Sequence, residues 1–365
     1  MKRVLLGILT LLAVVSCGRK EVKLHISSRY VRAGEEPVLV CSSIADAESK
    51  IVDYFFKDED SDYDEFDYDL FEEAVRAFPE EAMNYDFDRI KEWTSIEIFD
   101  TDDGNVRVYS WTYPPEGTMG TYGNILQYKW RGKVKFGTFT HNRDEFELDT
   151  RGLYTLDNGK YIRFEYLREW STQAYASAKA YRLTRRGLQA IPLFETEDGL
   201  SEMIDLEYCI PDWYFRAGRG QGYRWLFFFD DSKKTLYYPS SEEYNFLSDR
   251  YVPYVWDGKT MHPKREVGNP FLYPSLQEYE SLALLGRTSR NLIRIDYMAD
   301  GAYRYAAWPS LSEMNDRPEL VINGGFLNKA GKWIFKNQGV VYNVSESDLR
   351  VIKGGKEIAH WEFED

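Results

Sequence analysis

The sequence carries its densest set of possible ligand side chains in an acidic stretch over residues 58–69. Within it, Asp60, Asp62 and Asp64 occupy alternate positions, a spacing that lets carboxylates converge on one calcium ion. An EF-hand loop counted from Asp60 would also need glycine at its sixth position and glutamate at its twelfth, but the chain has glutamate and phenylalanine there. The stretch therefore predicts either a calcium site of another geometry or a solvated acidic face that stabilises the start of a following helix.

Three aromatic residues are candidates for a sugar-binding platform, because pyranose rings stack on the faces of Trp and Tyr. Trp111 and Tyr113 stand just before a Pro-Pro pair, and Trp256 stands just before an Asp-Gly turn. The alternative for each is cross-strand aromatic packing, which sheet proteins use routinely. The sequence leaves both interpretations open.

Catalytic motifs are lacking in the sequence. There is no GxSxG elbow. Glycoside hydrolysis needs two carboxylates at a fixed separation, and among 60 Asp and Glu residues no pair stands out. The favoured prediction is a non-catalytic protein that binds a glycan or a protein partner. The alternative is a secreted carbohydrate-active hydrolase that uses a carboxylate pair.

The N-terminus has the features of a secreted precursor. Two basic residues precede the apolar run 4–15, which is too short for a membrane span of about 20 residues. The small residue Ser16 and then Cys17 follow. This segment resembles the lipobox of bacterial lipoproteins, which implies cleavage before Cys17 and acylation of its sulfur. Gly18 after the cysteine resembles lipoproteins sorted to the outer membrane, so we expect a lipid-anchored protein of the bacterial cell envelope.

Charge and residue spacing exclude several partner classes. The net charge of −14 repels phosphate backbones, which argues against a nucleic-acid partner. The four histidines are isolated and no CxxC spacing occurs, so the sequence predicts no zinc, haem or other cofactor. Besides Cys17, the chain has Cys41 and Cys209, which could form a disulfide or remain as free thiols.

The pattern along the chain changes near Thr94. Apolar pieces at 24–26 and 38–40 indicate strands, and Leu70 to Phe78 has apolar residues at helical spacing. From Thr94 onward, short β-rich runs alternate with turn residues. We therefore predict four segments: a signal peptide (1–16), a lipid tether with the first strands (17–50), an acidic helical segment (51–93) and a β-rich domain (94–365).

The β-rich domain is predicted to be antiparallel and rich in hairpins. Turns such as Asp102–Asn105 and Arg131-Gly132 separate consecutive β-rich runs. The runs fall into groups at 94–140, 152–194 and 202–256, which favours a propeller-like array over a β-sandwich. Short phrases such as Val108–Trp111 and Gly117–Gly120 resemble secreted lipoproteins of the Bacteroidota. That resemblance implies no activity.

Overall fold

The computed structural model describes residues 21–31, 38–56, 66–113, 121–139, 148–157, 159–168, 173–209, 227–241 and 247–364. The lipobox with Cys17 and the calcium candidates Asp60, Asp62 and Asp64 lie outside these ranges, so what the sequence predicts for them stays a prediction. The chain divides into two compact units, Met1–Thr94 and Ser95–Asp365. This division falls where the sequence pattern changes.

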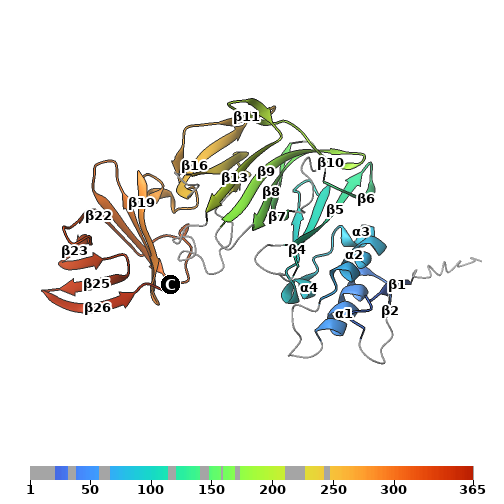
Figure 1. The fold of residues 1–365 in the computed structure, drawn as a ribbon, viewed down its shortest axis with the longest axis horizontal. Coiled ribbons are helices and arrows are strands. Elements are labelled where there is room, and N and C mark those ends of the chain that lie inside the picture. The colour runs from blue at the N-terminus through green and yellow to red at the C-terminus, as the bar shows by residue number, and fades with distance from the viewer. Residues whose placement is uncertain are drawn as a thin grey trace, which may run out of the picture. The chain divides into compact units, whose positions relative to one another are not determined.

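In its described residues, the N-terminal unit combines a pair of antiparallel strands with helices α1 to α4 (Figure 1). Strands β1 (Val22–His25) and β2 (Val38–Cys41) pair in antiparallel fashion. The helices are α1 (Ile44–Phe55), α2 (Tyr68–Ala77), α3 (Pro79–Ala82) and α4 (Asp88–Trp93). Helix α1 lies mostly within the segment expected to be tether and strands, which corrects that expectation. Ser43 caps α1 by accepting a 3.1 Å hydrogen bond from the Asp46 N–H.

The C-terminal unit is built from mostly antiparallel sheets (Figure 1). The first sheet contains β3 (Glu97–Asp100), β4 (Val106–Thr112), β5 (Tyr122–Trp130) and β6 (Lys133–Gly137). The central sheet contains β7 (Asp149–Asp157), β8 (Lys160–Arg168), β9 (Gln173–Thr184), β10 (Gly187–Ala190) and β13 (Met203–Cys209).

The third sheet has the strand order β12-β11-β17-β16-β15-β14, and β18 also pairs with β16. Its strands are β11 (Phe194–Thr196), β12 (Gly199–Ser201), β14 (Phe228–Asp230), β15 (Thr235–Ser241), β16 (Leu247–Trp256), β17 (Met261–Pro263) and β18 (Val267–Gly268). Its pairs are antiparallel apart from β11 with β17, which run parallel. A short 3-10 helix, η4 (Pro274–Leu276), precedes the next sheet.

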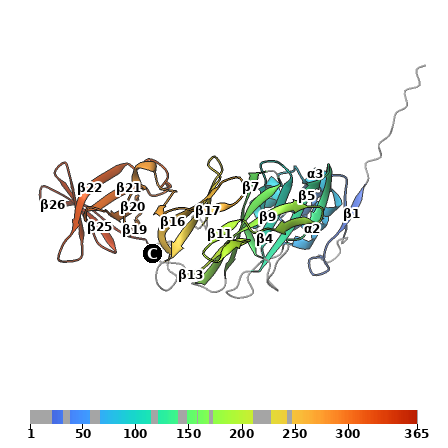
Figure 2. The same cartoon turned by 90° about the horizontal axis from the view of Figure 1, so that it is seen from above.

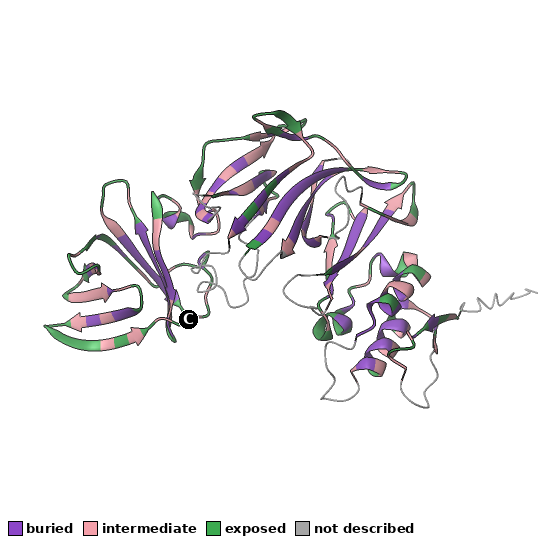
Figure 3. Ribbon diagram, viewed as in Figure 1, coloured by how far each residue is buried: buried purple, intermediate pink, exposed green. Residues whose placement is uncertain are grey.

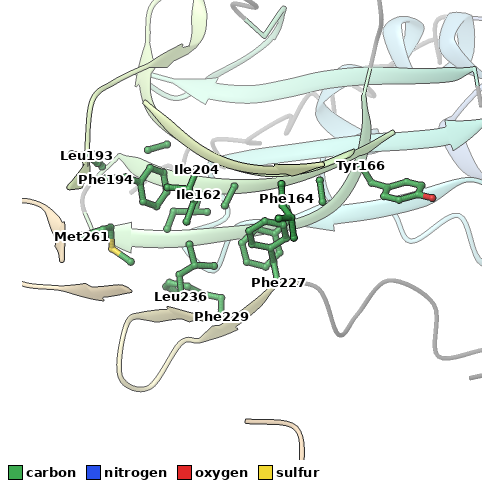
Figure 4. Close-up of a cluster of buried hydrophobic side chains, with 14 of the residues drawn as sticks. Ile162, Phe164, Tyr166, Leu193, Phe194, Ile204, Phe227, Phe229, Leu236 and Met261 are labelled. Carbon is green, nitrogen blue, oxygen red and sulfur yellow. The ribbon is translucent and has the colours of Figure 1, made fainter. Parts of the chain in front are cut away.

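The middle of the central sheet is buried on both faces, since residues 161–166 of β8 and 176–181 of β9 are buried in succession, and Figure 3 shows long purple stretches there. In β8, Tyr161 packs with residues of the first sheet such as Leu126. The next side chain, Ile162, packs with residues of the third sheet such as Leu236. Figure 4 shows this second contact, with Phe164 beside Phe227, at 5.5 Å between ring centroids. Because successive side chains of a strand point to opposite faces, β8 is apolar toward the third sheet and carries polar groups toward the first.

The last sheet is an eight-stranded meander whose strands pair in sequence order, and Figure 2 shows these strands grouped together. The strands are β19 (Ser281–Arg287), β20 (Asn291–Tyr297), β21 (Tyr303–Pro309), β22 (Leu320–Leu327), β23 (Trp333–Asn337), β24 (Val340–Val344), β25 (Asp348–Lys353) and β26 (Lys356–Glu362).

The meander curls so that its two ends meet. The Glu364 N–H, just beyond β26, donates to the Arg287 carbonyl at the end of β19, at 2.7 Å. The two halves also pack face to face, because the Tyr305 ring centroid lies 5.4 Å from that of Phe335. The result is a curled sheet around one buried apolar cluster.

The fold is mainly β, antiparallel and rich in hairpins, as the sequence predicts. The first predicted group, 94–140, is the four-stranded sheet β3–β6. The turn at Arg131-Gly132 joins β5 to β6, and both residues have positive φ, at 51° and 75°. The first three sheets of the C-terminal unit pack in chain order, as expected of an array, and in the described residues they contain four, five and seven strands.

Candidate functional site

Two of the predicted aromatic platform residues lie at the end of β4. Trp111 is only 2% exposed, and its ring lies against Gly123, where an added Cβ would come within 2.2 Å of it. Tyr113 is half-buried and its ring makes an edge contact with Trp111, at 6.0 Å between centroids. Trp111 offers no open ring face, so the structure favours the packing alternative for it.

Trp256, the third candidate, lies at the end of β16 and is half-buried. It packs against the core between the central and third sheets. The Lys160 ammonium group lies 4.7 Å from its ring centroid, in cation–π contact. Trp256 therefore has packing partners within the fold, and it does not line either of the pockets described below.

Two carboxylates of the acidic stretch, Asp67 and Asp69, lie in the described residues, and Asp69 is exposed in the first turn of helix α2. Asp67 is buried and caps helix α2, since its Oδ1 accepts from the Leu70 N–H at 3.2 Å. Its Oδ2 accepts from the Ser27 N–H at 2.9 Å. For this residue the structure supports the helix-start alternative. Among the described residues, no group of three or more His, Cys, Asp or Glu side chains could hold a metal ion.

A shallow pocket of about 510 Å³, which we call the tyrosine pocket, lies where the β11–β12 hairpin and β13 meet β15 and β16. Its lining combines aromatic rings with carboxylates and hydroxyls. The lining residues are Thr196, Asp198, Gly199, Leu200, Ser201, Met203, Ile204, Asp205, Tyr238 and Tyr254. Leu200 is 54% exposed, so the hairpin presents an apolar side chain to solvent at this place.

The two tyrosines of this pocket are positioned by neighbouring strands. In the β15–β16 register Tyr238 pairs with Val252, so Tyr254 is its diagonal neighbour. The two ring centroids are 6.3 Å apart and the rings cross at 73°. The Tyr238 hydroxyl donates to the Asp205 carbonyl at 2.8 Å, which ties β15 to β13.

Burial of the two rings changes their acidity. Desolvation raises the pKa of Tyr238 to about 12, and it also raises the pKa of Tyr254. Both phenols are therefore neutral at physiological pH. They can donate or accept hydrogen bonds, while the nearby Asp198 and Asp205 supply negative charge.

A charged triad fixes the strand beside the pocket. His262 on β17 contacts Glu195 on β11 through Nδ1 and Asp257 through Nε2, the latter at 2.8 Å. Hydrogen bonds to Glu195 and then Asp257 raise the pKa of His262. Glu195 directly precedes Thr196, which lines the tyrosine pocket. Protonation of His262 therefore strengthens the attachment of the β11–β12 hairpin.

Two networks of buried charge lie elsewhere in this unit. Arg163 on β8 is fully buried, and its Nη1 lies 2.8 Å from Glu165. Tyr181 and Ser177 donate to the same carboxylate, at 3.0 and 2.9 Å. All of these groups have partners inside the sheet stack, so this network is structural.

The second network joins the third sheet to the meander. Asp249 on β16 pairs with Arg294 on β20, and Asp296 lies between Arg294 and Arg304. Burial raises the pKa of Asp249. The carboxylates of Asp249 and Asp296 hold the pKa of Arg294 above its usual range although burial opposes this.

The tyrosine pocket was not found by sequence reasoning. Its residues come from the hairpin 194–201 and from β13, β15 and β16, which are distant in sequence. The aromatic sequences of β15 and β16 indicate strands, but they do not indicate which strands pair with them.

Cys41 and Cys209 are both free thiols, so of the two alternatives, a disulfide or free thiols, the structure has the second. No described helix is long and apolar enough to cross a membrane.

Comparison with known proteins adds little to the site. No family model matches the chain, and no curated protein matches it. Among solved structures, it is similar to a 6-phosphogluconolactonase candidate from Bacteroides fragilis, at 7% identity and TM-score 0.19, covering 73% of this chain and 86% of that one. It is also similar to the Dos1 propeller, at 9% identity and TM-score 0.23, covering 74% and 92%. These scores are too low to carry an argument on fold or function.

Proposed function

We propose that this chain is a non-catalytic glycan-binding protein of the bacterial cell envelope and that the glycan binds in the tyrosine pocket. The single observation that supports this best is the pairing of Tyr238 and Tyr254 in a shallow depression whose lining also includes Asp198 and Asp205. A sugar ring has apolar C–H faces and a polar edge. The tyrosine rings match the faces, and the carboxylates match the hydroxyls.

The acidic lining restricts the ligand. Carboxylates accept hydrogen bonds and repel anions, so neutral glycans are favoured over sulfated or uronic-acid polymers. The net charge of −14 also repels anionic ligands. A neutral polysaccharide or oligosaccharide is therefore the expected ligand.

A hydrolase remains the alternative function. Retaining and inverting enzymes need one carboxylic acid with a raised pKa close to a second carboxylate. Burial raises the pKa of Asp149 and of Asp249, yet each is paired with an arginine. Incubation of the protein with neutral polysaccharides and an assay for new reducing ends tests this alternative directly.

Anchoring is proposed from the sequence alone. The lipobox-like segment ends at Cys17, and a lipidated cysteine would hold the protein at a membrane without a spanning helix. The substitution Cys17→Ala should move the protein from the membrane to the soluble fraction after cell lysis. Unchanged membrane association would overturn this part of the proposal.

Glycan binding is tested with the mature chain on an array of neutral and charged glycans, followed by calorimetry with the best neutral ligand. Tyr254→Ala should weaken binding about tenfold, which corresponds to about 1.4 kcal/mol, whereas Tyr254→Phe should keep the stacking ring and most of the affinity. Tyr297→Ala is a matched control, because Tyr297 is 38% exposed on β20 and does not line the pocket. No neutral glycan bound, or equal losses in Tyr254→Ala and Tyr297→Ala, would contradict the proposal.

A further inference from the structure

A second pocket, of about 340 Å³, lies beside the first strand of the meander. Residues Ser281–Leu285 of β19 form one wall, and Leu247–Asp249 of β16 form another. Trp333 on β23 and Glu346, in the turn after β24, complete the lining. A volume at the lower end of the range for small-molecule sites suits a ligand the size of a single sugar ring.

Trp333 lines this pocket, and it carries a hydrogen-bond donor that no group in the described residues uses. The residue is 9% exposed, and its Nε1 is buried with no hydrogen-bond partner in the described part of the chain. Tryptophan Nε1 can only donate, and buried donors in proteins are nearly always paired. A ligand that places an acceptor oxygen at Trp333 would satisfy this group.

The other polar groups of the lining differ in whether they can still accept a hydrogen bond from a ligand. Both carboxylate oxygens of Asp249 are engaged, since Oδ1 accepts from Asn269 at 2.5 Å and Oδ2 pairs with Arg294 Nη1 at 2.8 Å. Asp249 therefore shapes the wall without offering an acceptor. Glu346 is exposed at the rim, where it can accept hydrogen bonds from ligand hydroxyls.

The apolar part of the lining comes from leucines. Leu247 and Leu284 are both buried, and they would contact a methyl group rather than another hydroxyl. The pocket thus combines a donor next to an apolar wall with an acceptor at the rim. An acetamido group has a carbonyl oxygen beside a methyl group, and a pyranose ring supplies hydroxyl donors.

We propose that this second pocket binds an N-acetylated sugar. The acetamido carbonyl accepts from Trp333 Nε1, the methyl group packs on the leucines, and ring hydroxyls donate to Glu346. The site shares no lining residue with the tyrosine pocket, so this proposal can be tested independently of the function proposed above.

The test is a titration of the full mature protein, labelled with ¹⁵N at tryptophan indoles, with N-acetylglucosamine, glucose and glucosamine in turn. The signal of Trp333, assigned by its absence in Trp333→Phe, should shift with N-acetylglucosamine at millimolar concentration and much less with glucose. No shift with any of the three sugars would overturn the proposal, because water alone would then fill the pocket. A larger shift with glucosamine would also overturn it, because the site would then select a cation.

One variant separates the effect of the N–H donor from that of the aromatic ring, and two further variants serve as controls. Trp333→Phe keeps an aromatic side chain and removes the N–H, so it should weaken N-acetylglucosamine binding about tenfold. Trp361→Phe, in the same meander but outside the lining, should bind as the unaltered protein does. Tyr254→Ala should leave this binding unchanged. Equal affinity in Trp333→Phe and the unaltered protein would contradict the proposal.

Discussion

Asp249 Oδ2 and Arg294 Nη1 lie 2.8 Å apart, and neither side chain is more than 2% exposed. The pair links β16 of the third sheet to β20 of the meander. Asp249 also has a left-handed backbone, with φ at 57°, which costs about 1–3 kcal/mol in a non-glycine residue. The Tyr279 hydroxyl donates to the Asp249 carbonyl at 2.6 Å and helps to hold this conformation.

Removal of the arginine should strongly destabilise this junction. Arg294→Met leaves Asp249 and Asp296 buried without their shared cation, and loss of one partner of a buried pair costs about 3–5 kcal/mol. Urea denaturation, followed by tryptophan fluorescence, measures the free energy of unfolding. Arg265→Met is the control, because Arg265 is exposed. A loss in Arg294→Met no larger than in this control would show that the pair does not stabilise the fold.

The histidine triad predicts a pH dependence of stability. Since the pKa of His262 is raised above 6.5 in the folded protein, its contribution is fully present below pH 6.5 and is lost as the pH rises through the folded value. The melting temperature should therefore fall as the pH rises through that range, and His262→Gln should remove that part of the decrease. Because His262 lies at the surface, the effect is small. An unchanged pH profile in the variant would refute it.

The buried Asp149 predicts a second decrease of stability with rising pH, and here the cause is burial of the carboxyl group rather than an ion pair. Burial raises its pKa from 3.8 to about 6, so the folded state binds a proton that the unfolded state has released. Stability should decrease by about 2–3 kcal/mol as the pH rises from about 4 to about 6. Asp149→Asn should flatten this part of the curve in denaturation experiments at several pH values, whereas Asp102→Asn, at an exposed turn, should leave it unchanged. A persistent slope in Asp149→Asn would assign the effect to other groups.

Gly325 should not tolerate a side chain. A Cβ at this position would lie 2.1 Å from the Phe335 ring, and Phe335 is 1% exposed. Gly325→Ala should therefore lower the free energy of unfolding by about 1–3 kcal/mol through overpacking. Asn323→Ala, at an exposed position of the same strand, should have little effect. Equal stability of the two variants would mean that the meander can open to accept the methyl group.

Local features were the part of this structure that sequence reasoning could predict. Turns such as Arg131-Gly132 have strong local preferences, so hairpins and strand positions follow from a few neighbouring residues. Helix α1 was missed because its apolar positions follow closely on a strand-like run at Val38–Val40.

Long-range contacts could not be predicted in the same way. The hydrogen bond between Tyr238 and Asp205 and the ion pair between Asp249 and Arg294 join strands that are far apart in the chain. Their partners depend on how whole sheets pack. The tyrosine pocket and the second pocket are products of that packing, so neither was visible in the residue pattern.

In β8, Tyr161 is directed to one neighbouring sheet and Ile162 to the other. The central sheet therefore needs both neighbouring sheets to cover its apolar side chains. A recombinant piece that ends after β10 would expose apolar side chains such as Ile162 and Phe164 to water and should precipitate or self-associate. Residues 95–365, which form one compact unit, should therefore be expressed together, and limited proteolysis should release them as one resistant product.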